Sequence, residues 1–291
     1  VGQAGMWGAL SIVLLANIIS LLTGLSLSAV ATSMKVRAGG NYYLISRSLG
    51  LEIGGAIGIP LYLSQAISVA FYIIGFTEAL YTVEFFQQFD PRLISIAVAI
   101  LFAVIAYVGA DFALKIQYFI LAILIASIIS FFAGGWNSFT EPFTEGLYTV
   151  YSEGGVAESI SYWAVFAVFF PAVTGIEVGT SLSGDLKDPS KSIPLGTIAS
   201  ILVTAVIYML VVVWFAYHTV DARGLVEDNL AMQRIAIVPS LILAGVWAST
   251  LSSALGSILA APRTLQAIAV DRVVPKWMAG QLGSRTEPRV A

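Results

Sequence analysis

Long apolar runs constrain this chain more than any other feature. Several of them reach the ~20 residues that an α-helix needs to cross the hydrocarbon core of a bilayer. Backbone groups in that core have no water to bind, so repeated runs of this length predict a bundle of membrane-spanning helices. The sequence therefore predicts an all-α polytopic membrane protein. The expected spans lie near residues 6–31, 51–82, 93–110, 113–133, 158–181, 194–217 and 237–260.

The composition supports this class and argues against several functions. Hydrophobic residues make up 58% of the chain and charged residues 11%, against roughly 25% charged in a soluble domain. There is no cysteine and a single histidine, His218, which excludes disulfides, thiolate metal sites and a histidine metal cluster. No nucleophile–base pair is visible, so we expect no enzyme, no cofactor and no nucleic-acid partner. The missing N-x-[ST] glycosylation motif favours a prokaryotic plasma membrane.

The distribution of charge gives the orientation of the spans. Of the 14 basic residues, only Arg92, Arg223 and Arg234 fall on one set of loops, and the others fall on the alternate loops. The positive-inside rule assigns the basic set to the cytoplasm, so the first span runs from outside to inside. An odd number of spans that starts this way predicts a fragment that is cut at both ends.

The fifth span contains the string FFPAVTGIEVG at residues 169–179, which interrupts an apolar run. Pro171 has no amide proton, and its ring clashes with the carbonyl four residues before it. Unwound backbone at membrane depth is tolerated only where it is buried in protein or lines a wet cavity. In secondary transporters, broken helices supply carbonyls for cations and amides for anions. The alternative is that Pro171 only kinks a packed helix.

Two further features have a functional and a structural interpretation. Ser249, Ser252 and Ser253 are spaced i, i+3, i+4, so their oxygen atoms lie on one face of the last span. Several hydroxyl and carbonyl oxygens suit a small hard cation, although small residues also allow helices to pack closely. Tyr72 in the second span is, taken alone, a core or interfacial tyrosine.

Four strings carry a resemblance to a known family. They are GGNYYLISRSLG at residues 39–50, FFPAVTGI at 169–176, SGDLKDPSKSIPLGT at 183–197 and ASTLSSALGS at 248–257. The chain resembles, over nearly its full length, the cation-chloride cotransporters of the sodium-potassium-chloride type. This family is a branch of the amino acid–polyamine–organocation superfamily.

The resemblance implies a fold and two cation sites. The fold would contain two inverted five-helix repeats with broken helices, and residues 1–291 would form one transport domain, incomplete at both ends, with family helices two to eight. The cation sites would use hydroxyl and carbonyl oxygens. The implied residues are Tyr72, Pro171 and Thr174 for potassium, and Ser249, Ser252 and Ser253 for sodium, with Ser249 acting through its carbonyl.

A chloride site would be formed by the backbone amides of Gly175, Ile176 and Glu177, at the start of the resumed half-helix. Glu177 departs from the cotransporter pattern, which has an apolar residue at this position. An ionised carboxylate would repel chloride, so Glu177 points away, is protonated, or marks a site that no longer binds chloride. Amino acid transporters of the superfamily often have Gly-aromatic-Glu at this position, which GIE partly matches.

The sequence therefore predicts a secondary active symporter that couples sodium and potassium movement to chloride by alternating access. The alternative is an amino acid or amine transporter of the same superfamily, coupled to sodium or protons. We expect small inorganic ions and the lipid bilayer as partners, and a homodimer formed through regions outside this chain. The transported ions Na⁺, K⁺ and Cl⁻ would be the only bound metal or halide ions.

Overall fold

The protein is seen in a computed structural model that describes residues 1–33, 39–108, 110–136, 139–151, 157–181, 186–218, 222–228 and 230–279. Within these residues, six helices are long and apolar enough to cross a membrane, and Pro91–Tyr107 adds a shorter apolar helix. This confirms the predicted class of an all-α polytopic membrane protein. The single transport domain expected over residues 1–291 stays a prediction.

The helices begin and end near the Gly, Pro and charged residues that flank the apolar runs. The α-helices are α1 (Gly5–Ser33), α2 (Gly40–Leu49), α3 (Leu51–Leu80), α4 (Pro91–Val108), α5 (Ala110–Ala133), α6 (Tyr162–Phe169), α7 (Ile176–Ser181), α8 (Pro189–His218), α9 (Ala222–Glu227), α10 (Met232–Ile235) and α11 (Pro239–Val270). Short 3₁₀ helices are η1 (Glu84–Gln88), η2 (Phe170–Val173) and η4 (Lys276–Ala279), and two strands are β1 (Thr149–Tyr151) and β2 (Ala157–Ser159).

The chain divides into two compact units, each built from three segments. Unit 1 contains Val1–Ser26, Ile128–Gly175 and Leu195–Ile242. Unit 2 contains Leu27–Ser127, Ile176–Pro194 and Leu243–Ala291. One boundary falls between Gly175 and Ile176, so the interrupted fifth span contributes to both units.

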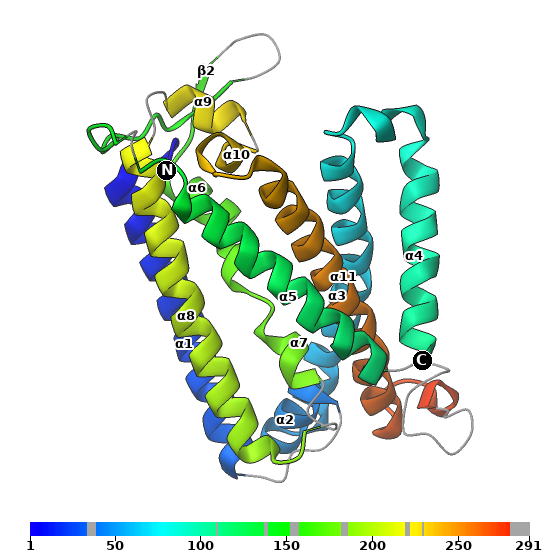
Figure 1. Ribbon diagram of the computed structural model, residues 1–291. Helices are drawn as coiled ribbons and strands as arrows, with labels where there is room; N and C mark the ends of the chain where they lie inside the picture. The colour runs from blue at the N-terminus through cyan, green and yellow to red at the C-terminus, as the bar shows by residue number, and fades with distance from the viewer. Residues whose placement is uncertain are drawn as a thin grey trace. The chain divides into compact units, whose positions relative to one another are not determined.

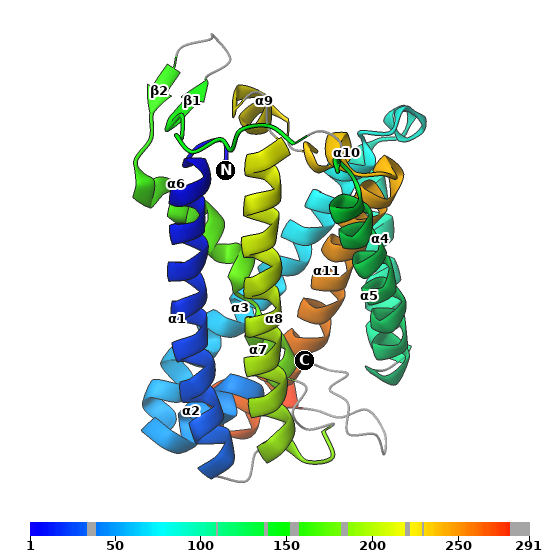
Figure 2. The ribbon, with the colours of Figure 1, turned by 60° about the vertical axis from the view of Figure 1, so that its left-hand side comes forward.

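In unit 1, α1 and α8 lie side by side (Figures 1 and 2). Ala9 and Val13 of α1 are buried with Val212 of α8, and Phe169 and Tyr208 pack against them. Lipid tails are as apolar as these side chains, so burial from water does not drive the contact inside a bilayer. Close van der Waals packing stabilises it instead.

A short hairpin at the N-terminal end of unit 1 was not predicted (Figure 2). β1 and β2 pair in antiparallel fashion, with Thr149 opposite Ser159. The Gln3 side chain binds Thr149 twice: its amide nitrogen donates to the Thr149 carbonyl at 2.6 Å, and its oxygen accepts from the Thr149 amide at 3.0 Å. Strands of three residues are too short for an alternating pattern to reveal them.

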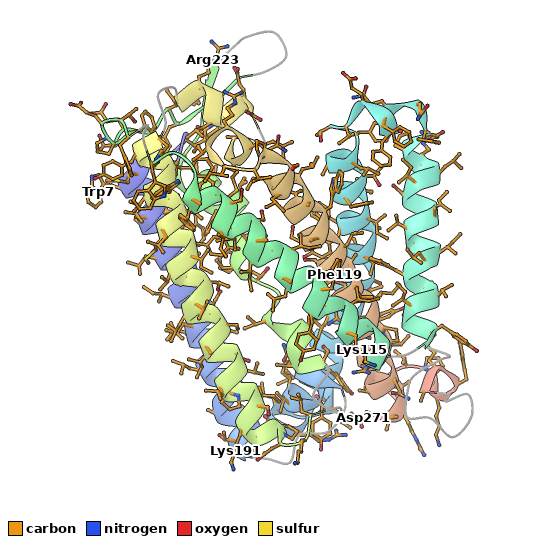
Figure 3. All side chains as sticks on the ribbon, viewed as in Figure 1. Trp7, Lys115, Phe119, Lys191, Arg223 and Asp271 are labelled. Atoms are coloured by element: carbon orange, nitrogen blue, oxygen red, sulfur yellow. The ribbon has the colours of Figure 1, made fainter. Side chains whose placement is uncertain are left out.

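In unit 2, α3, α4, α5 and α11 share a core. Ile73, Phe102, Ala113 and Leu255 represent the four helices in this buried cluster. Apolar side chains on other faces stay exposed, as expected of lipid-facing residues. Phe119 is 69% exposed on α5 and is labelled in Figure 3.

A charged cluster attaches α2 to the end of α11 in unit 2. Tyr42 is fully buried, and its hydroxyl donates to Asp271 Oδ2 at 2.9 Å. The Arg47 guanidinium pairs with Asp271 Oδ1 at 2.7 Å. Burial, and then the hydrogen bond to Asp271, raises the pKa of Tyr42 to about 12. Lys115, Lys191 and Asp271 lie toward the lower end of unit 2 in Figure 3, the end that the charge pattern assigns to the cytoplasm.

Candidate functional site

The fifth span is interrupted at the point that the sequence predicts. α6 ends at Phe169, η2 follows as one 3₁₀ turn, and Thr174 is extended with φ −93° and ψ −176°. Gly175 has φ 94°, a conformation that favours glycine. A Cβ atom at Gly175 would meet no atom within 4 Å, so backbone conformation, not crowding, selects glycine here.

Two of the predicted potassium ligands are neighbours in this break. The carbonyl of Pro171 accepts hydrogen bonds from the Thr174 amide at 3.2 Å and from the Thr174 hydroxyl at 2.7 Å. Both side chains belong to unit 1 and are exposed. The break therefore places one carbonyl and one hydroxyl oxygen side by side, joined by a hydrogen bond that a bound cation would have to replace.

The next two carbonyls of the break are bound by hydroxyl groups from neighbouring helices. Tyr208 of α8 donates to the Ala172 carbonyl at 2.9 Å, and Ser20 of α1 donates to the Val173 carbonyl at 3.0 Å. These bonds satisfy backbone oxygens that a continuous helix would have used, as unwound backbone in a membrane requires. Sequence reasoning missed both residues. The only signal was a polar side chain inside each apolar span.

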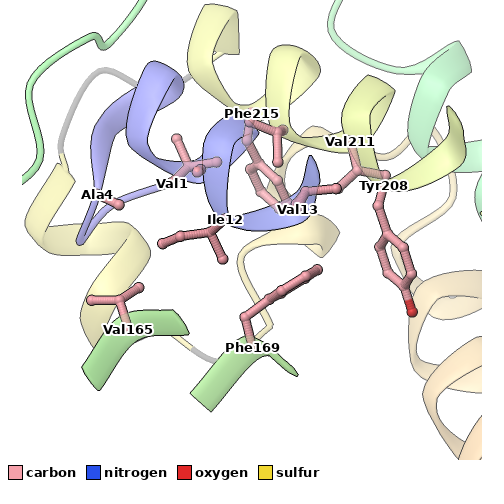
Figure 4. Close-up of a pocket in the computed structure, with 11 residues that line it drawn as sticks. Val1, Ala4, Ile12, Val13, Val165, Phe169, Tyr208, Val211 and Phe215 are labelled. Carbon is pink, nitrogen blue, oxygen red and sulfur yellow. The ribbon is translucent and has the colours of Figure 1, made fainter. Parts of the chain in front are cut away.

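A cavity of about 230 Å³ lies beside the break within unit 1 (Figure 4). Its one polar side-chain group is the Tyr208 hydroxyl, which already donates to Ala172. The remaining lining is apolar, so this cavity offers no ligands for an ion. It is lined by Val1, Ala4, Ala9, Ile12, Val13, Val165, Phe169, Tyr208, Val211, Val212 and Phe215.

The three serines predicted for sodium lie in α11, which is continuous across them. The Ser249 hydroxyl donates to the Val246 carbonyl of the same helix at 2.9 Å. The Ser252 hydroxyl donates instead to Oε1 of Gln117 on α5, and the Gln117 amide nitrogen donates to the Ser252 carbonyl at 3.2 Å. The Ser253 hydroxyl has no hydrogen bond to any residue that the structure describes, so its oxygen is uncommitted there. Sequence reasoning missed Gln117.

The second half of the interrupted span packs next to these serines within unit 2. Val178 of α7 approaches Gly256 of α11 so closely that a Cβ atom at Gly256 would lie 2.9 Å from Val178 Cγ1. Thr180 of α7 also donates to the Asn41 side chain at 2.7 Å. Gly256 is one turn beyond Ser252, so the structure brings α7 and the serine face of α11 together.

The other predicted site residues are only partly placed. Tyr72 packs against the core of unit 2 and contacts Phe71 edge to face, whereas Pro171 and Thr174 belong to unit 1. The potassium site as a set of three residues stays a prediction. α7 begins at Ile176, and the first amides of an α-helix have no acceptor inside that helix. The side chain of Glu177 lies outside the described residues, so the chloride site also stays a prediction.

Comparison with known proteins identifies the family. The family model "Amino acid permease" matches residues 1–291. Solute carrier family 12 member 2 of Mus musculus is 34% identical to the chain over 342 aligned residues, which cover 99% of this chain and 28% of the mouse protein. Solute carrier family 12 member 1 of Homo sapiens is 34% identical over 345 residues, covering 99% of this chain and 31% of the human protein.

The chain thus spans less than a third of the length of these relatives. They are animal proteins, so they give no support to the prokaryotic origin expected from the missing glycosylation motif. The description of the family model and the names of these relatives are those of transporters. The resemblance inferred from the four sequence strings is confirmed: the chain belongs to the amino acid permease family, on its cation-chloride cotransporter branch.

Proposed function

We propose that this chain forms the ion-binding part of a secondary active symporter that moves sodium and potassium together with chloride by alternating access. The observation that carries the proposal is the interruption at Thr174 and Gly175, with the Pro171 carbonyl and Thr174 hydroxyl 2.7 Å apart. A kinked but packed helix would keep Thr174 and Gly175 in helical conformation, whereas both depart from it here.

Each ion is assigned to a different kind of ligand. Potassium binds oxygens of Pro171 and Thr174 together with the Tyr72 hydroxyl. Sodium binds the hydroxyls of Ser252 and Ser253 and the Ser249 carbonyl. The grouping of Ser252 with an adjacent unbonded Ser253 on one face of α11 supports the sodium site.

Chloride binds the backbone amides of Gly175, Ile176 and Glu177 in this proposal. The positive φ of Gly175 and the start of α7 at Ile176 support it, because the first amides of a helix are free to bind an anion. The whole protein acts in the plasma membrane as a homodimer, with no cofactor beyond its transported ions.

The test uses the full-length protein in proteoliposomes. Uptake of rubidium tracer is measured in full medium, without sodium, and without chloride. The symporter predicts that uptake collapses when either ion is removed. Rubidium uptake that stays unchanged without sodium and without chloride would exclude this coupling.

The second candidate is an amino acid or amine transporter, and the observation that favours it is Glu177 in the string GIE. Replacement of Glu177 by Gln separates the two. A proton-coupled amino acid transporter would lose its pH dependence in Glu177→Gln, whereas a symporter for the three ions would keep sodium- and chloride-dependent rubidium uptake. Accumulation of a labelled amino acid by the wild-type protein would decide for the second candidate.

A further inference from the structure

Gln117 and Ser252 make a reciprocal contact between α5 and α11 in unit 2. The Ser252 hydroxyl donates to Gln117 Oε1 at 2.5 Å, and the Gln117 amide nitrogen donates to the Ser252 backbone carbonyl at 3.2 Å. One side-chain amide thus binds two atoms of one residue. This fixes the rotation of the amide group, because exchanging its oxygen and nitrogen would set two acceptors, Gln117 Oε1 and the Ser252 carbonyl, against each other.

The contact determines where the Ser252 proton points. A serine hydroxyl has one proton to donate and two lone pairs that accept or coordinate. With the proton directed to Gln117, both lone pairs of Ser252 Oγ remain for another partner. A hydroxyl that pointed its proton toward a cation would instead repel the ion.

Ser249 provides the contrast on the same helix face. Its hydroxyl donates to the Val246 carbonyl, three residues earlier in the same helix, at 2.9 Å. Helical serines commonly make this local bond and need no neighbouring helix for it. Ser252 forms its bond with Gln117 instead, so the environment of α5 selects a different orientation for this hydroxyl.

We propose that Gln117 is a positioning residue for a sodium ion bound at Ser252 and Ser253. It orients the Ser252 hydroxyl so that the oxygen atom, rather than the proton, meets the ion. This inference rests on the proposed sodium coupling. It extends the site to a helix that the expected ligand set does not include.

The main experiment measures rubidium uptake by the full-length protein as a function of sodium concentration. Gln117→Met keeps an unbranched side chain and removes both hydrogen bonds. We expect the half-saturating sodium concentration to rise roughly three- to tenfold, about the net contribution of one hydrogen bond, because only the bond to the Ser252 hydroxyl bears on the ion. The half-saturating concentrations of rubidium and chloride and the maximal rate should change little.

Gln65→Met is the matched control. Gln65 of α3 is a buried glutamine whose Oε1 accepts a hydrogen bond from Thr264 at 3.0 Å. Thr264 belongs to α11, as Ser252 does, so Gln65→Met also removes a glutamine bond to α11, but one that lies away from the three serines. Sodium dependence should stay at the wild-type value. An equal change in Gln65→Met and Gln117→Met would mean that Gln117 only holds helices together, and would overturn the proposal.

A double-mutant cycle tests whether Gln117 acts through Ser252. In a Ser252→Ala background there is no hydroxyl to orient, so Gln117→Met should add no further loss of sodium affinity. Additive effects would contradict the positioning role. Thermal unfolding of each purified variant in sodium, against choline, gives a second reading without transport, because a bound ion stabilises the folded state. The sodium-induced rise in Tm should shrink in Gln117→Met.

The outcomes separate this inference from the proposed function. If wild-type uptake depends on sodium and Gln117→Met has the wild-type sodium dependence, the positioning role is wrong and the symporter stands. If neither rubidium uptake nor thermal unfolding of the wild-type protein depends on sodium, the positioning role and the proposed sodium-coupled symporter are both wrong.

Discussion

The two segments that carry the expected ion sites are built in opposite ways. The Tyr162–Ser181 span is interrupted, and it offers backbone groups that a helix normally consumes. α11 is an unbroken helix from Pro239 to Val270, and it offers side-chain hydroxyls that project from one face. A chain can therefore offer oxygen ligands in two ways. It can unwind its backbone, or it can place hydroxyl side chains on one face of a regular helix.

The interrupted span and the continuous helix need different hydrogen-bond partners from neighbouring helices. Unwinding leaves backbone carbonyls to be satisfied, and Ser20 and Tyr208 donate to two of them. The regular helix leaves no such carbonyl, but its hydroxyls must be oriented, and Gln117 binds one of them. Substitutions in the break should thus affect folding and transport together, whereas substitutions of Ser252 and Ser253 on α11 should act mainly on ion affinity.

The largest effect is expected at the turn between the two halves of the break. Gly175→Val introduces a β-branched residue at φ 94°, which costs on the order of 1–3 kcal/mol. We expect loss of rubidium uptake and a lower Tm in detergent. Gly179→Ala is the control, because Gly179 lies within α7, has no positive φ, and has open space around its Cβ position. Wild-type uptake in Gly175→Val would show that the conformation of the break does not matter.

On the continuous helix, alanine substitutions of the three serines should differ in their effect on sodium affinity. Ser252→Ala and Ser253→Ala each remove a proposed sodium ligand, so the half-saturating sodium concentration for uptake should rise at least about tenfold, or ~1.4 kcal/mol. Ser249→Ala removes only a hydroxyl bound to Val246, and its carbonyl remains. We expect that variant to stay within about 0.5 kcal/mol of wild type. Equal losses in all three variants would mean that close packing, and not ligand chemistry, explains the serines.

The hydroxyl groups that support the break should have a smaller effect on transport and act mainly on stability. Tyr208→Phe leaves the Ala172 carbonyl without its donor, and Ser20→Ala does the same for Val173. Each should lower the free energy of unfolding by about 1–3 kcal/mol if the carbonyl finds no other donor. Tyr162→Phe is the control, since its hydroxyl contacts Ser11 at an exposed position. Unfolding of purified variants in detergent measures the difference, and a Tyr208→Phe value equal to that of Tyr162→Phe would refute the support.

The same comparison shows what could be predicted from sequence. The break was predictable because Pro171 and Gly175 act through their own backbone, and the serine face because helical spacing is local. Gln117, Ser20 and Tyr208 were not, since each works through a residue more than 30 positions away in the chain. The hairpin was missed because its strands have only three residues each. Local backbone geometry follows from neighbouring residues in the sequence, whereas the choice of hydrogen-bond partner depends on tertiary packing.

The smallest effect is expected at the charged cluster beyond the end of α11, and only in alkaline solution. The pKa of Tyr42 is raised from 10.0 to about 12 by burial and by its bond to Asp271. Below pH 10 the phenol is neutral in both the folded and the unfolded protein, so its contribution to stability is complete. Between about pH 10 and 12 the unfolded chain loses the proton while the folded protein keeps it, so stability falls as the pH rises.

Tyr42→Phe removes this titration without removing the ring. The Tm of wild type should exceed that of Tyr42→Phe by a constant amount below pH 10, and the difference should narrow from pH 10 to 12. Asp271→Asn, which keeps an acceptor but not the charge, should show a weaker narrowing, because burial remains while the carboxylate no longer raises the pKa. A wild type and a Tyr42→Phe variant with parallel Tm curves across this range would show that the buried phenol does not link α2 to the end of α11. Of the two bonds to Asp271, the Arg47 pair would then be the one that links α2 to the end of α11.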